Sequence, residues 1–315
     1  MTNQIKRTWI IIGVLFSIAA IGSVSFLYAI THVIEPTITV KNTLSCCPDL
    51  ITRCLIILAM IHSVLPWIGI AVLLIGLINA VSRLMLSING SMKLVERLEW
   101  QKVGVRGYSK IKKLAPNKDI FKRIIIFEDN RLHNAFTVGF LQPRIYLSGT
   151  LCKRLEREEL RAVILHESHH VRKYDPLRLL IVAFICDTFF FIPLSRFLKE
   201  LFISSKEKAA DDAAIAASRR PLELASAMMK LLKLKNDLVL NSTAIWRADS
   251  QTERIHRLID PMKDRPLGLP YLRAAVSLIV IVVLLGMLTL PSFAYKLPIL
   301  GTLNCRSSHS LIIDK

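Results

Sequence analysis

His166-Glu-Ser-His-His170 lies inside a run of helical periodicity from Glu156 to Tyr174. Because His166 and His170 are four residues apart, their imidazoles lie one above the other on one helix face, as two ligands of a tetrahedral zinc ion require. Glu167, next to the first histidine, can take a proton from a zinc-bound water whose pKa the metal lowers. His169 points about 100° away from the other two. The alternative interpretation is a set of histidines on a solvated basic helix.

A zinc site of this type needs a third protein ligand and one open position. Downstream, Glu207-Lys-Ala-Ala-Asp211 lies in an alanine-rich helical stretch. Glu207 supplies a carboxylate, and Asp211 follows one helical turn later. The alternative for Glu207 is an ordinary solvated charge on a helix.

The overall composition is that of a membrane protein. Hydrophobic residues make up 52% of the 315 residues and the mean hydropathy is +0.45, which is too apolar for a soluble or a disordered chain. The formal net charge of +18 would suit a nucleic-acid-binding protein, but no zinc-finger, RNA-recognition or helix-turn-helix pattern accompanies it. We therefore expect no direct nucleic-acid binding and interpret the cations as topology signals that attract anionic membrane lipids.

Three apolar runs are long enough to cross about 30 Å of hydrocarbon. We interpret the first as a retained anchor, with removal as a signal peptide as the alternative. The stretch from Arg83 to Arg178 is much richer in cations than the stretch between the first two runs, so the positive-inside rule places it in the cytoplasm. The resulting division is an N-terminal anchor (1–33), an external loop (34–54), a second transmembrane helix (55–88), a cytoplasmic domain (89–270), a last transmembrane helix (271–294) and a short external tail (295–315).

Four cysteines agree with this topology, because they lie on or near the outer side, where disulfides persist. Which of them pair is left open. They are Cys46, Cys47, Cys54 and Cys305.

A topological constraint applies to residues 177–206. Leu177 to Leu198 is apolar enough to cross the membrane, but one crossing would put Glu207 on the opposite side from His166. If the two share a zinc ion, the segment has to return. Pro193 is a natural break between two helices of about 14 residues each. We predict a helical hairpin that is re-entrant, packed in the membrane or lying along its surface.

The cytoplasmic domain also has strand signals. Lys122 to Phe127 is a β-rich run, and Asn134 to Ser148 is typical of a hairpin or strand pair around Gly139 and Pro143. The predicted fold class is therefore a mostly α membrane protein with an α+β cytoplasmic domain, about three full spans and the helical hairpin.

Three motifs occur in order within residues 60 to 260: Asn134-Ala-Phe-Thr-Val-Gly-Phe-Leu-Gln-Pro-Arg-Ile-Tyr-Leu-Ser148, then Glu158-Glu-Leu160 leading into His166-Glu-Ser-His-His170, and then Glu207-Lys-Ala-Ala-Asp211. With these motifs the chain resembles the gluzincin metallopeptidases, and specifically the BlaR/MecR family of integral-membrane peptidases. The HtpX-type membrane proteases are the next most similar group. The ordered set is much more specific than the pentapeptide alone.

The resemblance implies a zincin-like protease domain that holds one Zn²⁺ per chain. His166, His170 and Glu207 would be its ligands, and Glu167 the general base. Asp211 would accept a hydrogen bond from a ligating imidazole and fix its tautomer.

The resemblance also implies an edge strand at Pro143–Ser148, to which an extended substrate adds by backbone pairing. Its contact residues would be Arg144, Ile145, Tyr146 and Leu147. Simple core packing is the alternative for this strand. The stretch Glu253-Arg254-Ile-His256-Arg257 could bring a cation or an imidazole to the transition state, and His256 is the candidate stabiliser. The alternative is a basic helix that flanks the membrane.

The expected function is that of a zinc metalloendopeptidase in the bacterial cytoplasmic (inner) membrane, with several spans and the active site on the cytoplasmic side. In the resembled family, cleavage serves signalling, such as inactivation of a transcriptional repressor. Only about 20 residues follow the last span, so we expect no penicillin-binding sensor domain; a sensor partner or a second copy of the chain would complete the system. The alternatives are an HtpX-type quality-control protease and a non-catalytic membrane sensor or scaffold with a structural metal site.

Overall fold

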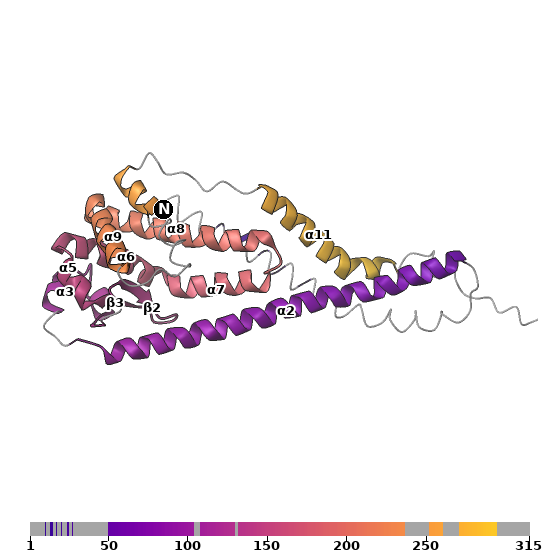
Figure 1. The fold of residues 1–315 in the computed structure, drawn as a ribbon, viewed down its shortest axis with the longest axis horizontal. Coiled ribbons are helices and arrows are strands. Elements are labelled where there is room, and N and C mark those ends of the chain that lie inside the picture. Colours follow the sequence, from indigo (N-terminus) through magenta and orange to yellow (C-terminus); the bar gives the residue numbers. More distant parts are fainter. Residues whose placement is uncertain are drawn as a thin grey trace, which may run out of the picture. The chain divides into compact units, whose positions relative to one another are not determined.

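A computed structural model describes residues 50–103, 108–129, 132–236, 252–260 and 271–294, together with isolated helical positions between residues 10 and 27 (Figure 1). Most of the predicted first span and of the external loop, and the whole tail 295–315, lie outside these residues. The chain divides into two compact units. Unit 1 comprises residues 1–14, 81–186 and 197–268, and unit 2 comprises residues 15–80, 187–196 and 269–315.

The described chain is mostly helical and contains one small sheet. A further helical segment covers residues 252–259. The other elements are α2 (Leu50–Trp100), α3 (Tyr108–Leu114), α4 (Lys118–Lys122), β1 (Ile124–Phe127), β2 (Ala135–Val138), β3 (Arg144–Ser148), α5 (Gly149–Arg154), α6 (Arg157–Lys173), α7 (Asp175–Thr188), α8 (Pro193–Ser218), α9 (Pro221–Asn236) and α11 (Tyr271–Ala294).

The sheet of unit 1 has the strand order β1-β3-β2. β3 pairs in parallel with β1 and antiparallel with β2, so the predicted hairpin over 134–148 is confirmed. The prediction that Arg144 to Leu147 form an edge strand is wrong, because β3 is the central strand. The physical reason is β1, whose sequence Ile-Ile-Ile-Phe is buried at every position and pairs with the free side of β3. β2 is therefore the edge strand next to β3.

Gly139 begins the connection between β2 and β3 with a φ of +106°. A Cβ atom there would lie 2.6 Å from the carbonyl oxygen of Gln142, so both the backbone conformation and the space require glycine. This turn sets the register of the hairpin, in which Thr137 lies opposite Ile145.

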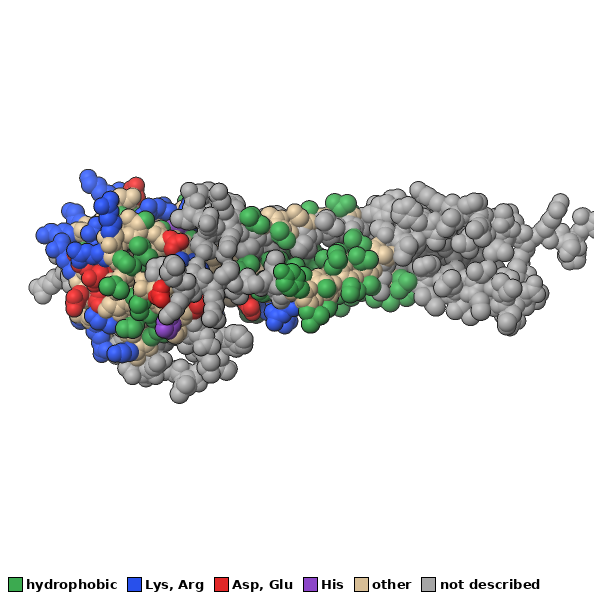
Figure 2. All heavy atoms as spheres, turned by 90° about the horizontal axis from the view of Figure 1, so that it is seen from above, with side chains coloured by type: hydrophobic (Ala, Val, Ile, Leu, Met, Phe, Trp, Pro, Cys, Tyr) green, Lys and Arg blue, Asp and Glu red, His purple; other side chains and the backbone are tan. Residues whose placement is uncertain are grey.

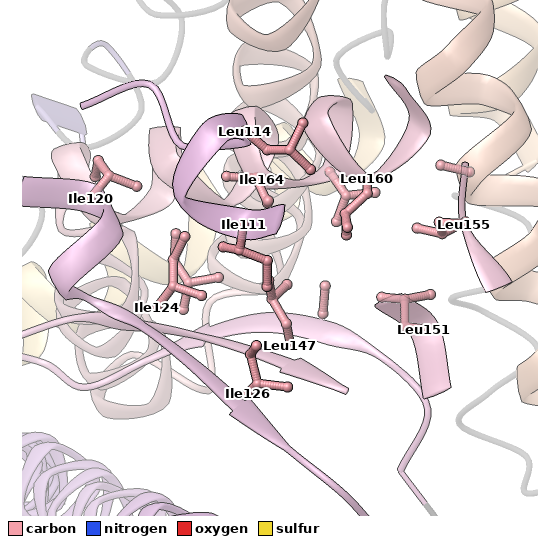
Figure 3. Close-up of a cluster of buried hydrophobic side chains, with 14 of the residues drawn as sticks. Ile111, Leu114, Ile120, Ile124, Ile126, Leu147, Leu151, Leu155, Leu160 and Ile164 are labelled. Carbon is pink, nitrogen blue, oxygen red and sulfur yellow. The ribbon is translucent and has the colours of Figure 1, made fainter. Parts of the chain in front are cut away.

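The two faces of the sheet pack on different elements. α6 covers the face that carries Ile126 and Leu147, and Figure 3 shows these side chains gathered with Ile111 and Ile164. The other face packs against Leu98, near the end of α2. Full burial of one such isoleucine or leucine stabilises the fold by roughly 1.5–3 kcal/mol. The sheet and α2 thus hold α6 in a fixed position.

α6 is capped at both ends. Glu156 and Glu159 form a capping box at its start. The Glu159 carboxylate also accepts hydrogen bonds from Ser226 and Lys230 of α9. At the other end Tyr174 adopts a left-handed conformation with a φ of 52°, which stops the helix and directs the chain into α7.

The predicted helical hairpin is present as α7, a short turn and α8. α7 has 14 residues, as expected, and Pro193 is the first residue of α8, where a proline fits best. α8 is longer than expected, at 26 residues. Nothing interrupts its helical sequence before Ser218, because the segment after Pro193 is rich in alanine and other helix formers.

One helix of the described chain is long and apolar enough to cross a membrane by itself, over Trp67–Trp100. This stretch is the later part of α2. α2 itself starts within the predicted external loop and continues beyond residue 88, the predicted end of the second span. α11 coincides with the predicted last span, and its described apolar stretch, Tyr271–Gly286, is shorter. Large apolar side chains are exposed on both helices, as on surfaces that contact a membrane or another protein: Ile75 and Ile78 on α2, and Leu278, Ile279 and Val282 on α11.

Within unit 2, α2 packs closely against the end of α7 at Gly76. A Cβ atom at this position would lie 2.1 Å from the backbone oxygen of Thr188. We expect Gly76→Ala to destabilise the protein by about 1–3 kcal/mol, because backbone has to move. Thermal unfolding in detergent measures the effect.

Gly90→Ala on the same helix is the matched control, since nothing lies within 4 Å of a Cβ atom there. Alanine is the better helix former, so this variant should be stabilised by up to about 1 kcal/mol. Equal behaviour of the two variants would contradict the close approach at Gly76.

Candidate metal centre

Three side chains from two helices bring their donor atoms together in unit 1. The Nε2 atoms of His166 and His170 on α6 lie 3.1 Å apart. Glu207 of α8 places its Oε2 atom 3.5 Å from Nε2 of His166 and 3.8 Å from Nε2 of His170. Both histidines are buried. The three predicted ligands therefore form one group, in which the ligand atoms all lie within 4.8 Å of one another.

The environment of the imidazoles fits a divalent metal ion. Nδ1 of His166 lies 3.0 Å from Asp211 Oδ1, and Nδ1 of His170 lies 2.7 Å from Asp175 Oδ2. A carboxylate at Nδ1 favours the tautomer with its proton on that atom, which leaves the Nε2 lone pair free. Two lone pairs facing each other repel unless a cation lies between them. A tetrahedral zinc ion would place its two nitrogen ligands about 3.3 Å apart, close to the spacing found here.

Asp211 lies where the resemblance implied, one turn after Glu207 and beside His166. Asp175, by contrast, was not among the site residues singled out from the sequence. It is the first residue of α7, it is 1% exposed, and it accepts hydrogen bonds from both His170 and Arg178. The sequence signal for this role is the position of Asp175 just after the end of α6, where the chain turns back toward His170.

An arginine from the helical segment 252–259 supplies positive charge to two carboxylates of the centre. Arg254 donates to both carboxylate oxygens of Asp211, at 2.6 and 2.9 Å, and its Nη1 lies 2.9 Å from Glu207 Oε2. The choice of His256 as the stabilising residue is not supported, because His256 is exposed on this helix. Two residues correspond to about 200° of helical rotation, so Arg254 and His256 point in opposite directions.

Glu167 is also held by a residue that sequence reasoning did not single out. Thr137 of β2 donates a hydrogen bond from Oγ1 to Glu167 Oε2 at 2.7 Å. Glu167 itself is buried and is not one of the three metal donors. The sequence contained no signal for this contact, since an alternating strand does not reveal which face meets which helix.

The four residues proposed as substrate contacts on β3 do not form an accessible surface. Ile145, Tyr146 and Leu147 are fully buried, at 0% exposure. Arg144 is exposed but is paired with Glu99 of α2 at 2.8 Å. Their burial follows from the central position of β3, so the alternative of simple core packing is correct.

The comparison with known families agrees with this geometry. A family model described as BlaR1 peptidase M56 matches residues 5–259. The chain belongs to this family. No curated protein matches the sequence. The M56 chain is thus a member of a family of membrane-associated metallopeptidases, as the resemblance indicated, and the match extends further toward the N-terminus than the motifs alone.

Carboxylates and cationic side chains lie close together in the metal centre of the M56 chain. Burial favours the neutral forms of Glu207 and Asp211, but nearby groups outweigh it. For Glu207 these are Lys206, a hydrogen bond from His166 and Arg254, and for Asp211 they are Arg254 and a hydrogen bond from His166. The pKa of Glu207 is held well below its usual range, and that of Asp211 is lowered to about 2. Burial would lower the pKa of His166, yet the contacts with Asp211 and Glu207 raise it to about 9. In the absence of metal the centre therefore holds a proton at neutral pH.

Metal binding by the M56 peptidase should therefore depend on pH. The raised pKa means that the proton is present below about pH 9, and a ligating imidazole must lose it. We expect the apparent metal affinity to fall about tenfold for each pH unit below this value. Calorimetric titration with zinc at pH 7, in buffers of different ionisation enthalpy, should detect about one proton released per ion. Release of no proton would contradict the protonated state.

Proposed function

We propose that this M56 peptidase is a zinc-dependent endopeptidase that cleaves a protein substrate. The observation that carries the proposal is the convergence of the His166, His170 and Glu207 donor atoms beside Glu167. Within the described residues the donor group has three side chains, whereas a structural zinc site is closed by four protein ligands. Three ligands and an adjacent buried carboxylate are typical of catalytic zinc sites, which disfavours a purely structural role.

The chemistry divides between the metal and the protein. A bound zinc ion would polarise the scissile carbonyl group and lower the pKa of a water molecule. Glu167 would accept the proton of the attacking water and later deliver it to the leaving amine. Asp175 and Asp211 would hold the two imidazoles in the tautomer that binds metal. Arg254 would keep Glu207 and Asp211 ionised and in place.

An extended substrate segment would add to β2 rather than to β3. β2 is an edge strand of the sheet, and one of its side chains touches Glu167. Backbone pairing along β2 would therefore bring a peptide bond to the region of the general base. This places the substrate strand on the opposite side of the hairpin from the one expected from the sequence.

We further propose a place for the enzyme in the cell. The exposed apolar helices and family membership support a multi-pass protein of the bacterial cytoplasmic membrane, with residues 89–270 on the cytoplasmic side. Figure 2 shows Lys and Arg side chains gathered over the visible surface of unit 1, which suits contact with anionic lipids. Exposed cations in this unit include Lys112, Lys113, Lys153, Arg154, Arg157, Arg161, Arg219 and Arg220.

Membership of the BlaR1 peptidase family supports a role in signal transduction, with a transcriptional repressor as the proposed substrate. A sensor partner or a second copy of the chain would deliver the signal. A quality-control protease would instead cut many unfolded membrane proteins. Comparison of the proteome before and after induced expression separates the two roles, since one cleaved protein supports signalling and many support quality control.

The catalytic proposal is tested with full-length protein purified in detergent. Elemental analysis should find about one zinc ion per chain, as expected for a three-ligand catalytic site. A chelator should abolish cleavage of a peptide library, and stoichiometric zinc should restore it. Protein that carries no metal after zinc loading, or that cleaves equally well without metal, would overturn the proposal.

A further inference from the structure

The contact between β2 and α6 links the sheet edge to the proposed general base. Thr137 Oγ1 lies 2.7 Å from Oε2 of Glu167 and 3.3 Å from the backbone oxygen of the same residue. A hydroxyl group has one proton, and the shorter distance to a charged acceptor favours donation to the carboxylate. Within the described residues, no side chain donates to Oε1 of Glu167, so this oxygen is free to accept a proton.

The register of the sheet fixes the direction of Thr137. Ala135 and Thr137 face α6, whereas Phe136 and Val138 belong to the cluster on the opposite face, with Leu98. Because strand side chains alternate, a shift of one residue would turn the hydroxyl group away from Glu167. The pairing of Thr137 with Ile145 of the central strand prevents such a shift.

We propose that Thr137 is a positioning residue for the general base, an inference that rests on the proposed function. Its hydroxyl group holds one carboxylate oxygen of Glu167 and leaves the other to accept the proton of the attacking water. A glutamate side chain has several rotatable bonds, so one fixed oxygen removes much of its freedom. Since Thr137 lies on the edge strand proposed to bind substrate, it also ties the position of the base to the substrate strand.

The test compares Thr137→Val, which keeps the shape and removes the hydroxyl group, with Thr137→Ser, which keeps the hydroxyl group. We expect kcat to fall by about 10- to 100-fold in the valine variant, with KM changed by less than about twofold, and the serine variant to lie within about threefold of wild type. Zinc content should be unchanged in both, because Thr137 is not a metal donor. Thr150→Val on α5 is the matched control for loss of a threonine hydroxyl group.

Binding of a small hydroxamic acid gives a readout that needs no turnover. Its acidic N–H and O–H groups are donors for a correctly placed Glu167 carboxylate once the ligand is on the metal. We expect its affinity to fall about tenfold in Thr137→Val, from the weakening of a hydrogen bond to a charged group, and to recover in Thr137→Ser.

Two outcomes would overturn the inference alone: a valine variant with wild-type kcat and hydroxamate affinity, or a serine variant as impaired as the valine variant. The second outcome would mean that the methyl group matters and not the hydroxyl group. Failure of the proposed function has a different signature, because wild-type protein loaded with zinc would then itself cleave nothing.

Discussion

Replacing Glu167 with glutamine is expected to lower the rate of peptide cleavage by about 10²- to 10⁴-fold while zinc binding is retained. The amide has nearly the same shape as the carboxylate, and its NH₂ group cannot accept a proton. Glu167 is not one of the three side chains that form the donor group, so its charge is not needed to hold the ion. The measurement pairs a cleavage assay with elemental analysis of the same preparation.

Glu158→Gln provides the matched control, because Glu158 lies on the same helix and its two ion pairs, with Arg161 and Arg220, are long, at 3.8 and 3.9 Å. This variant should keep wild-type activity. If Glu167→Gln cleaves at the wild-type rate, another group must act as the base. If it loses zinc together with activity, Glu167 is a ligand and the assignment of roles on α6 is incorrect.

Removing the Arg254 side chain is expected to have the largest effect on stability. Asp211 is 0% exposed, and Arg254 supplies its closest hydrogen bonds; His166, at 3.0 Å, and Arg257, at 3.5 Å, are the next positive groups. Arg254→Ala would leave a buried carboxylate poorly compensated, and breaking one side of a buried ion pair costs about 3–5 kcal/mol. Thermal and denaturant unfolding of the metal-free protein in detergent measures this loss.

Bound zinc should reduce the loss of stability caused by Arg254→Ala, because an ion between His166 and Glu207 supplies positive charge close to Asp211. The difference in stability between variant and wild type should therefore be smaller with zinc than without it. Arg161→Ala, on the exposed side of α6, is the control and should change stability by less than about 0.5 kcal/mol. A variant as stable as wild type without metal would mean that Arg254 is dispensable.

The parts of the centre that lie on one helix were predictable from the sequence. The four-residue spacing of His166 and His170 fixes their geometry as soon as a helix forms, and the same holds for Glu207 and Asp211 on α8. The hairpin break at Pro193 was predictable for a similar reason, since proline restricts the backbone locally.

Contacts between elements distant in sequence were not predictable in this way. Arg254, Thr137 and Asp175 acquire their roles from the packing of a helix, a strand and a turn against α6 and α8. The sequence narrows the candidate residues to the helical segment 252–259. The choice between Arg254 and His256 within it depends on which side of that helix faces α8. The sequence of β3, in which Ile145 and Leu147 alternate with more polar residues, fits an edge strand and a central strand equally well, because successive side chains of any strand point to opposite faces. The structure buries four consecutive residues of β3, which the alternation alone did not predict.

The left-handed residue Tyr174 has a consequence for how this protein can vary. It lies between His170 and Asp175, so a proposed metal ligand and the acid that contacts it are joined by a segment of only four residues. One inserted residue would rotate the acid by about 100° around the helix axis, and one deletion would do the same in the opposite sense. Functional homologues should therefore differ in amino-acid identity within this segment but keep its length, while insertions accumulate in connections that do not bridge a ligand and its partner.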